Sequence, residues 1–142
     1  MLPALTAAST AEDRTNSVLA LTQLSAALAV YRTSHDYYPE KIDDLVPAVI
    51  GKVPVDFYEG KPLVYKRLND GYLIYAVGAN GKDDAGSNDQ MSTFEGRILD
   101  ELEPTEAEAL KVKVPTGADD FSLRIPRPAF KLPPAQAPEV AK

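Results

Sequence analysis

The sequence predicts an α+β domain in which a long N-terminal amphipathic helix packs on a small antiparallel β-sheet. Apolar residues recur every three or four positions between Ser9 and about Asp36, which is the spacing of one helix face. Residues 63–77 contain two apolar runs around the turn Asn69-Asp70-Gly71, a pattern typical of a β-hairpin. A further alternating run, Phe121 to Ile125, predicts a last strand with Phe121, Leu123 and Ile125 facing inward.

The length of 142 residues allows one domain with one modest core. We expect this domain to span residues 1–125, with its core in residues 9–86 and 116–125. Residues 87–115 are acidic and are predicted to leave the core as an excursion, with a helical piece from Thr105 to Lys111. Five prolines in residues 126–142 predict an extended or disordered tail.

The helix pattern predicts which residues are buried and where the helix begins and ends. The predicted apolar face consists of Val18, Leu21, Leu24, Leu28 and Tyr31, widened by Leu19, Ala26, Ala27 and Val30. Ser9 followed by Glu12 predicts a capping box at the start. At the other end, Asp36 tolerates left-handed geometry. A short second helix is expected over Pro39–Val46, where proline suits the first turn.

His35 is the only histidine, so a zinc-binding or catalytic role is one interpretation. It also stands where a cation favours the C-terminus of a helix, and capping or packing is the simpler interpretation. Asp56 and Glu59 flank two aromatic residues, a spacing that a carboxylate hydrolase could use. A turn begun by Asp56 explains the same residues, and we expect no enzyme.

The charge of the chain is concentrated in one segment. Nine acidic residues and one base lie between Asp83 and Glu108, whereas the remainder carries a small positive balance. Because no basic stripe exists, nucleic-acid binding is not expected. No run of 18 apolar residues occurs, which predicts that nothing in this sequence spans a membrane. Cysteine is absent, which excludes a disulfide framework and thiol chemistry.

The loop after the predicted hairpin is rich in oxygen ligands. Residues 78–86 contain three glycines, Asn80 and the pair Asp83-Asp84. Glycine allows the backbone to fold back and turn carbonyl groups inward. Calcium binds six to eight oxygen atoms from carboxylates, amides and carbonyls. Half of a calcium site is therefore one interpretation of the loop, and a solvated hairpin loop is the other, since the same residues form ordinary turns.

The order of these elements resembles the soluble domain of the major pseudopilins of type II secretion systems. It is even more similar to a pseudopilin-derived module of bacterial membrane and periplasmic proteins. The matching residues are Leu28-Ala29-Val30-Tyr31, Tyr38-Pro39, Leu45-Val46-Pro47, Val53-Pro54-Val55-Asp56, Gly60-Lys61-Pro62-Leu63-Val64-Tyr65, Gly71-Tyr72, Tyr75-Ala76-Val77-Gly78-Ala79-Asn80-Gly81 and Asp119-Asp120-Phe121. The resemblance covers about residues 15–125 and implies a pilin-like fold.

The resemblance also implies a calcium site between the loop and the start of the last strand. Carried over by position, Asn80 stands where the family has its first aspartate, and Asp119 and Asp120 stand at its acidic pair. Asp83 and Asp84 are additional candidate ligands. Asn80 departs from the family and should weaken cation binding, and the distance along the chain to Asp119 is longer than the family needs.

The resemblance implies a non-enzymatic, extracytoplasmic structural module in a secretion or envelope complex, stabilised by calcium. Its expected partners are proteins, including other copies that assemble through the long helix. The family's apolar N-terminal segment is absent from the sequence, so membrane attachment is expected only through a segment outside it. A metal-free interaction domain of a membrane-anchored protein is the alternative.

Overall fold

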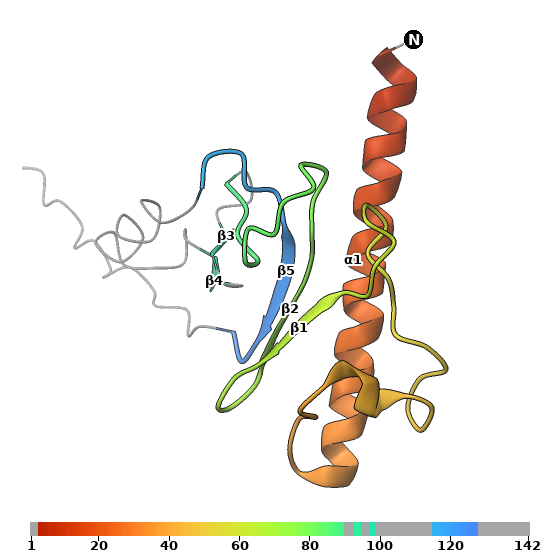
Figure 1. The fold of residues 1–142 in the computed structure, drawn as a ribbon, viewed down its shortest axis with the longest axis vertical. Coiled ribbons are helices and arrows are strands. Elements are labelled where there is room, and N and C mark those ends of the chain that lie inside the picture. The colour runs from red at the N-terminus through yellow and green to blue at the C-terminus, as the bar shows by residue number, and fades with distance from the viewer. Residues whose placement is uncertain (1–2, 90–92, 95–96, 99–114, 128–142) are drawn as a thin grey trace, which may run out of the picture.

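The computed structural model describes residues 3–89, 93–94, 97–98 and 115–127. One helix, α1 (Pro3–His35), lies along one face of a three-stranded antiparallel sheet (Figure 1). The strands are β1 (Val64–Arg67), β2 (Tyr72–Ala76) and β5 (Phe121–Ile125), in the order β1-β2-β5. This arrangement confirms the α+β class and the packing of a helix on a small antiparallel sheet.

The helix begins earlier than the sequence analysis predicted. Ser9 lies inside α1, so the predicted capping box at Ser9 and Glu12 is wrong. The preceding residues explain the longer helix, because Pro3 suits a first turn and the following Ala and Leu residues favour helix. None of the helices in the described residues is long and apolar enough to cross a membrane.

The buried face of α1 is displaced slightly from the predicted one. Leu21, Leu24, Ala27 and Leu28 are buried as expected. Val18, however, is 47% exposed, and the buried position in that turn is taken by Ser17. Leu19, Ala26 and Val30 are also exposed, so the predicted widening of the face is wrong at these three positions. The buried face of α1 is narrower than predicted, because the sheet that covers it is only three strands wide.

The C-terminus of α1 follows the predicted local chemistry. His35 Nδ1 lies 2.9 Å from the carbonyl oxygen of Tyr31, and the two rings stack with centroids 3.9 Å apart. Asp36 adopts a left-handed conformation with φ of 64°, as expected. The second helix, predicted over Pro39–Val46, is shorter in the structure. It is a single 3-10 turn, η1 (Ile42–Leu45), so the expected place of Pro39 in its first turn is wrong.

The register of the sheet separates its residues into two faces. Lys66 pairs with Leu73, and Leu73 pairs with Arg124, so these three residues form one row across the sheet. Because directly paired residues project to the same side of a sheet, this row shares a face. The neighbouring row, Tyr65, Ile74 and Leu123, projects to the opposite face, where it packs with the core of α1.

The central strand β2 is buried on both faces, although only one face meets the helix. All five of its residues are buried. On the face away from α1, the loop around Gly86 covers the sheet: a Cβ added at Gly86 would lie 3.4 Å from the Tyr75 ring and 3.5 Å from Leu73 Cδ2. The loop after β2 therefore takes the position of a second covering layer.

The same loop meets the residues before β5 in a short paired region, which we call the neck (Ser87–Asp89 with Gly117–Asp120). The Asp120 amide donates to the Ser87 carbonyl at 3.0 Å, and the Asp89 amide donates to the Ala118 carbonyl at 2.9 Å. Gly117 N donates to Asp89 Oδ2 at 2.5 Å. Residues 87–89, which the sequence analysis assigned to the acidic excursion, are therefore paired with the segment before β5.

Beyond the neck, the described residues include a two-stranded pair, β3 (Thr93–Phe94) and β4 (Arg97–Ile98). The sequence analysis predicted no strand there. The predicted helical piece from Thr105 to Lys111 lies outside the described residues, as does most of the proline-rich tail, residues 128–142.

Candidate metal centre

The candidate site forms where β2 ends beside the start of β5. The chain leaves β2 through Val77 and Gly78, both of which are buried. A Cβ added at Gly78 would lie 2.1 Å from Asp119 Oδ1, so only glycine leaves room for that carboxylate. The glycine thus brings the backbone after β2 against the acidic pair before β5.

Asp120 is the most buried acidic residue of the site, with 0% exposure. Its Oδ2 accepts backbone amides from Asp84 at 3.0 Å and from Gly86 at 2.9 Å. Its Oδ1 accepts the Gly78 amide at 3.4 Å. One carboxylate thus holds both ends of the loop that follows β2.

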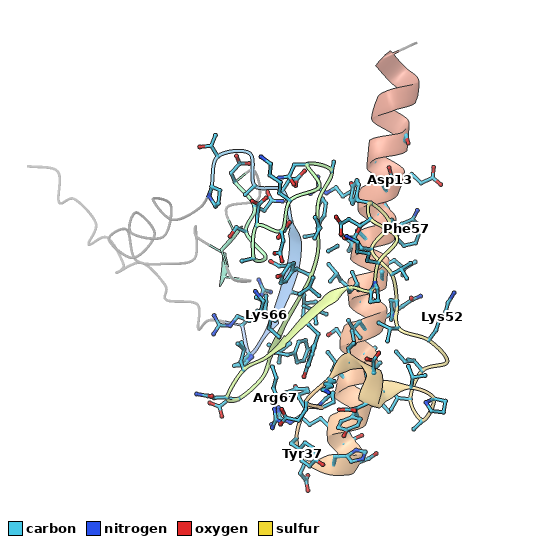
Figure 2. All side chains as sticks on the ribbon, in the orientation of Figure 1. Asp13, Tyr37, Lys52, Phe57, Lys66 and Arg67 are labelled. Carbon is cyan, nitrogen blue, oxygen red and sulfur yellow. The ribbon has the colours of Figure 1, made fainter. Side chains whose placement is uncertain are left out.

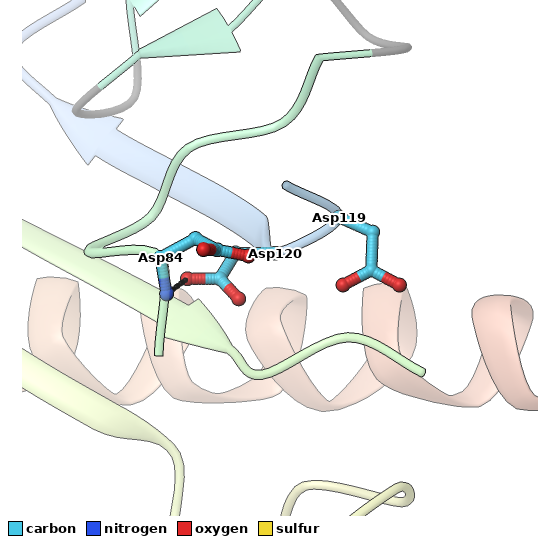
Figure 3. A group of neighbouring side chains, drawn as sticks. All are labelled: Asp84, Asp119 and Asp120. Atoms are coloured by element: carbon cyan, nitrogen blue, oxygen red, sulfur yellow. Dashed lines mark hydrogen bonds between the residues drawn. The ribbon is translucent and has the colours of Figure 1, made fainter. Parts of the chain in front are cut away.

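Three aspartates converge at this point. Asp84, Asp119 and Asp120 each offer a carboxylate oxygen, and these oxygens lie within 4.8 Å of one another (Figure 3). Asp84 comes from the loop, whereas the other two immediately precede β5. Figure 3 shows the carboxylates of Asp84 and Asp120 close together, with the hydrogen bond from the Asp84 amide to Asp120 drawn between them.

Asp119 leaves one of its oxygen atoms without a partner. Its Oδ2 accepts the Asn80 amide at 3.1 Å. Its Oδ1 is buried and has no hydrogen-bond partner within the part of the chain that the structure describes. The hydroxyl of Ser87 is also buried and has no hydrogen-bond partner among the described residues. Ser87 lies beside the site, because its carbonyl accepts the Asp120 amide. Buried polar atoms without a partner are uncommon, and a bound cation would give both of these oxygens one.

The two remaining predicted ligands are directed differently. The side-chain amide of Asn80 donates to Asp84 Oδ2 at 2.8 Å, while its Oδ1 accepts the Lys82 amide at 2.6 Å. Asp83 Oδ1 accepts the Tyr75 hydroxyl and the Ala85 amide, each at 2.9 Å. The structure therefore brings together Asp84, Asp119 and Asp120. Asn80 donates hydrogen bonds to two of them, Asp84 and Asp119, and Asp83 is turned toward Tyr75.

Without a cation, the three neighbouring carboxylates repel one another when they are ionised. Burial raises the pKa of Asp120 to about 6, against the lowering effect of the amides of Gly86 and Gly78. The neighbouring carboxylates of Asp84 and Asp83 contribute to the same rise. A divalent cation would favour the ionised form of all three aspartates, since opposite charge within a few ångström stabilises a carboxylate.

The donor set is compatible with a hard cation. Asp120 Oδ2 accepts two amides, but Oδ1 accepts only the Gly78 amide and retains a lone pair that can coordinate an ion. Three carboxylates supply part of the six to eight oxygens that calcium binds, and backbone carbonyls or water would supply the others. All three ligands are oxygen atoms, which disfavours zinc and other metals that prefer nitrogen or sulfur.

Asp56, the carboxylate of the alternative enzymatic interpretation, binds backbone amides. Asp56 is 2% exposed, and its two oxygens accept the amides of Val77 at 2.6 Å and Tyr58 at 2.8 Å. Glu59 lies in an ion pair with Lys61 at 3.0 Å. The geometry supports the turn predicted at Asp56. The sequence analysis missed its contact with Val77, because nothing local indicates a partner 21 positions away.

Asp89 is a second residue whose contact the sequence analysis did not identify. Its backbone and side chain both bind the segment before β5, as described for the neck. The Ser87-Asn88-Asp89 sequence is typical of turns, and that composition was the only available signal.

Comparisons of the chain with protein-family models, curated proteins and solved structures found no match.

Proposed function

We propose that this chain is a non-enzymatic, pseudopilin-like structural module that binds calcium between Asp84, Asp119 and Asp120. The observation that carries this proposal is the convergence of these carboxylates, together with the buried and unpartnered Oδ1 of Asp119. The helix packed on a three-stranded antiparallel sheet is consistent with the pilin-like fold that the resemblance implies.

In this proposal the ion has a structural purpose. Asp84 belongs to the loop after β2, whereas Asp119 and Asp120 belong to the segment before β5. A cation bound by all three would tie the loop to the last strand and remove the repulsion between their charges. The same loop covers the outer face of β2, so fixing it would also stabilise the sheet.

The proposed role is assembly with protein partners in an extracytoplasmic secretion or envelope complex. The support for assembly lies on the face of α1 that points away from the sheet. Val18, Leu19 and Val30 are 47%, 54% and 55% exposed there, apolar side chains that a partner could cover. Gln23→Glu would place a charge on this exposed helix and should weaken assembly without affecting folding.

Thermal unfolding tests the proposal under three conditions: in EDTA, with added calcium, and with added magnesium. Calcium at about a hundred times its Kd would add about 2.7 kcal/mol to the free energy of unfolding. For a domain of this size the melting temperature should rise by about 8 °C. Magnesium should have a smaller effect, since it demands near-ideal octahedral geometry.

The matched variants are Asp119→Ala and Lys82→Ala. Asp119→Ala should abolish the calcium-dependent rise, because it removes the unpartnered oxygen. Lys82→Ala changes the charge of the same loop at an exposed side chain and should retain the rise. An equal rise in both variants, or no rise in the unmodified protein, would contradict calcium binding at this site.

A metal-free interaction domain of the same fold is the second candidate. Backbone amides already bind Asp120 from both ends of the loop, so the loop has a hydrogen-bonded arrangement of its own. The absence of any calcium effect, combined with partner binding through α1, would favour this function.

A further inference from the structure

A second candidate site lies on the outer face of the sheet, away from α1. The row Lys66, Leu73 and Arg124 places one cation on each side of a leucine. Strands lie about 4.8 Å apart, so the backbones of the two cations are separated by about 10 Å. Both side chains are long enough to converge between the strands.

Lys66 and Arg124 both line one cavity. Its volume is about 160 Å³, and its walls are Lys66, Leu68, Leu73, Ala85 and Arg124. The three other side chains are apolar. The cavity therefore combines two positive charges with an apolar wall, a combination unlike that of the aspartate cluster.

Arg124 supplies a buried hydrogen-bond donor that lacks an acceptor. Its Nε is buried and has no hydrogen-bond partner among the residues that the structure describes. Arg124 is not part of the ion pair between Lys61 and Glu59 or of that between Arg67 and Glu40. A buried donor left unpaired is destabilising, and an acceptor that reached it from the cavity would remove that cost.

Lys66 is held at the mouth of the cavity. Its ammonium group lies 5.1 Å from the centre of the Tyr75 ring, and its side chain is exposed. Tyr75 in turn donates to Asp83 and is fixed by the loop. The ammonium is therefore positioned by an aromatic ring and remains accessible to a ligand.

From these observations we propose that the cavity binds a carboxylate of an acidic peptide, with an apolar side chain of that peptide against Leu68 and Leu73. The guanidinium of Arg124 matches a planar carboxylate through its Nε and a terminal nitrogen, and Lys66 adds a second charge. Because the two basic residues complement acidic side chains, we take an acidic segment of a partner protein as the occupant. None of the three proposed calcium ligands lines the cavity.

Binding of a fluorescently labelled peptide, measured by anisotropy, tests this site. Leu-Asp-Glu-Leu-Glu with blocked ends is the probe, and Leu-Asn-Gln-Leu-Gln is its neutral counterpart. The acidic peptide should bind, and the neutral peptide should bind at least about tenfold more weakly, because the carboxylates carry the interaction. Raising the salt concentration should weaken binding, since the site is open to solvent.

Lys66→Gln and Arg124→Gln should each weaken binding by about tenfold. Arg124→Lys keeps the charge but loses the planar fork, and its effect should be intermediate. Lys52→Gln is the matched control, because Lys52 is an exposed lysine on the opposite side of the molecule from Lys66 (Figure 2).

Lys66→Gln removes an exposed side chain, so its result does not depend on whether Arg124 variants fold. No binding of the acidic peptide would overturn the proposal. Equal binding by the neutral peptide, or an unchanged affinity in Lys66→Gln and Arg124→Gln, would also overturn it. Because calcium is omitted from these measurements, their outcome is independent of the calcium test.

Discussion

The carboxylate of Asp120 accepts the backbone amide of Gly86 at 2.9 Å, although 34 positions of sequence separate the two residues. Asp120 also accepts the amides of Asp84 and Gly78. Asp120→Ala should therefore lower the free energy of unfolding by about 2–4 kcal/mol in EDTA, because buried amides lose their acceptor. Denaturant unfolding measures this loss.

Asp119→Ala provides the comparison for Asp120→Ala. Asp119 accepts a single amide, from Asn80, so its removal should cost about 1 kcal/mol in EDTA. Both variants should lose the calcium-dependent stabilisation. Equal costs in EDTA would contradict the assignment of Asp120 as the residue that holds the loop.

Gly78→Ala should disrupt the same site through steric contact. The added Cβ would lie 2.1 Å from Asp119 Oδ1 and 2.3 Å from the Asp119 carbonyl oxygen, so the acidic pair must move. We expect a loss of about 2 kcal/mol or more and a weaker calcium effect. Gly51→Ala is the control, since nothing lies within 4 Å of its added Cβ. A calorimetric scan with and without calcium compares the two variants.

Tyr65 should make stability sensitive to alkaline pH. Its hydroxyl donates to the Pro39 carbonyl at 2.7 Å, and burial is the main cause that raises its pKa to about 12. The unfolded chain loses this proton near pH 10, whereas the folded protein retains it. The stabilisation is therefore complete below about pH 10 and is lost as the pH rises from about 10 to about 12.

Tyr65→Phe separates this effect from that of the other tyrosines. At pH 8 the variant should be less stable by about 1 kcal/mol, because the hydrogen bond to Pro39 is lost. The difference from the unmodified protein should decrease as the pH rises above 10. Denaturant unfolding at several pH values measures it, and a constant difference would contradict the interpretation.

Leu24→Ala tests the packing of α1 on the sheet. Leu24 has 0% exposure and belongs to the core cluster, so its truncation should cost about 3 kcal/mol. Leu19→Ala is the matched change on the same helix, where the side chain is 54% exposed, and it should cost less than about 0.5 kcal/mol. Similar losses at both positions would show that α1 is oriented differently.

Much of the fold could be predicted because its signals are local. The turn Asn69-Asp70-Gly71 and the apolar runs beside it indicated the hairpin, and β5 has the predicted bounds. The left-handed Asp36 agrees with the tolerance of aspartate for that geometry. The start of α1 was missed because no breaker precedes Ser9, so propensity carried the helix back to Pro3.

The candidate site was only partly predictable, because its geometry depends on contacts distant in sequence. Composition placed oxygen ligands in the loop after β2, and the resemblance added Asp119 and Asp120. Whether Asp83 or Asp84 faces the acidic pair depends on Tyr75, which binds Asp83 from the sheet. The cavity at Arg124 required the register of three strands, which no single stretch of sequence contains.

The neck has a consequence for how the length of the chain can vary. Hydrogen bonds between Asp89 and the pair Gly117-Ala118 fix both ends of the intervening segment at the edge of the sheet. The entropy of closing such a loop grows only logarithmically, by about 0.6 kcal/mol for each doubling of its length. Insertions or deletions between the two sides of the neck can therefore accumulate while the hairpin, β5 and the aspartate cluster keep their arrangement.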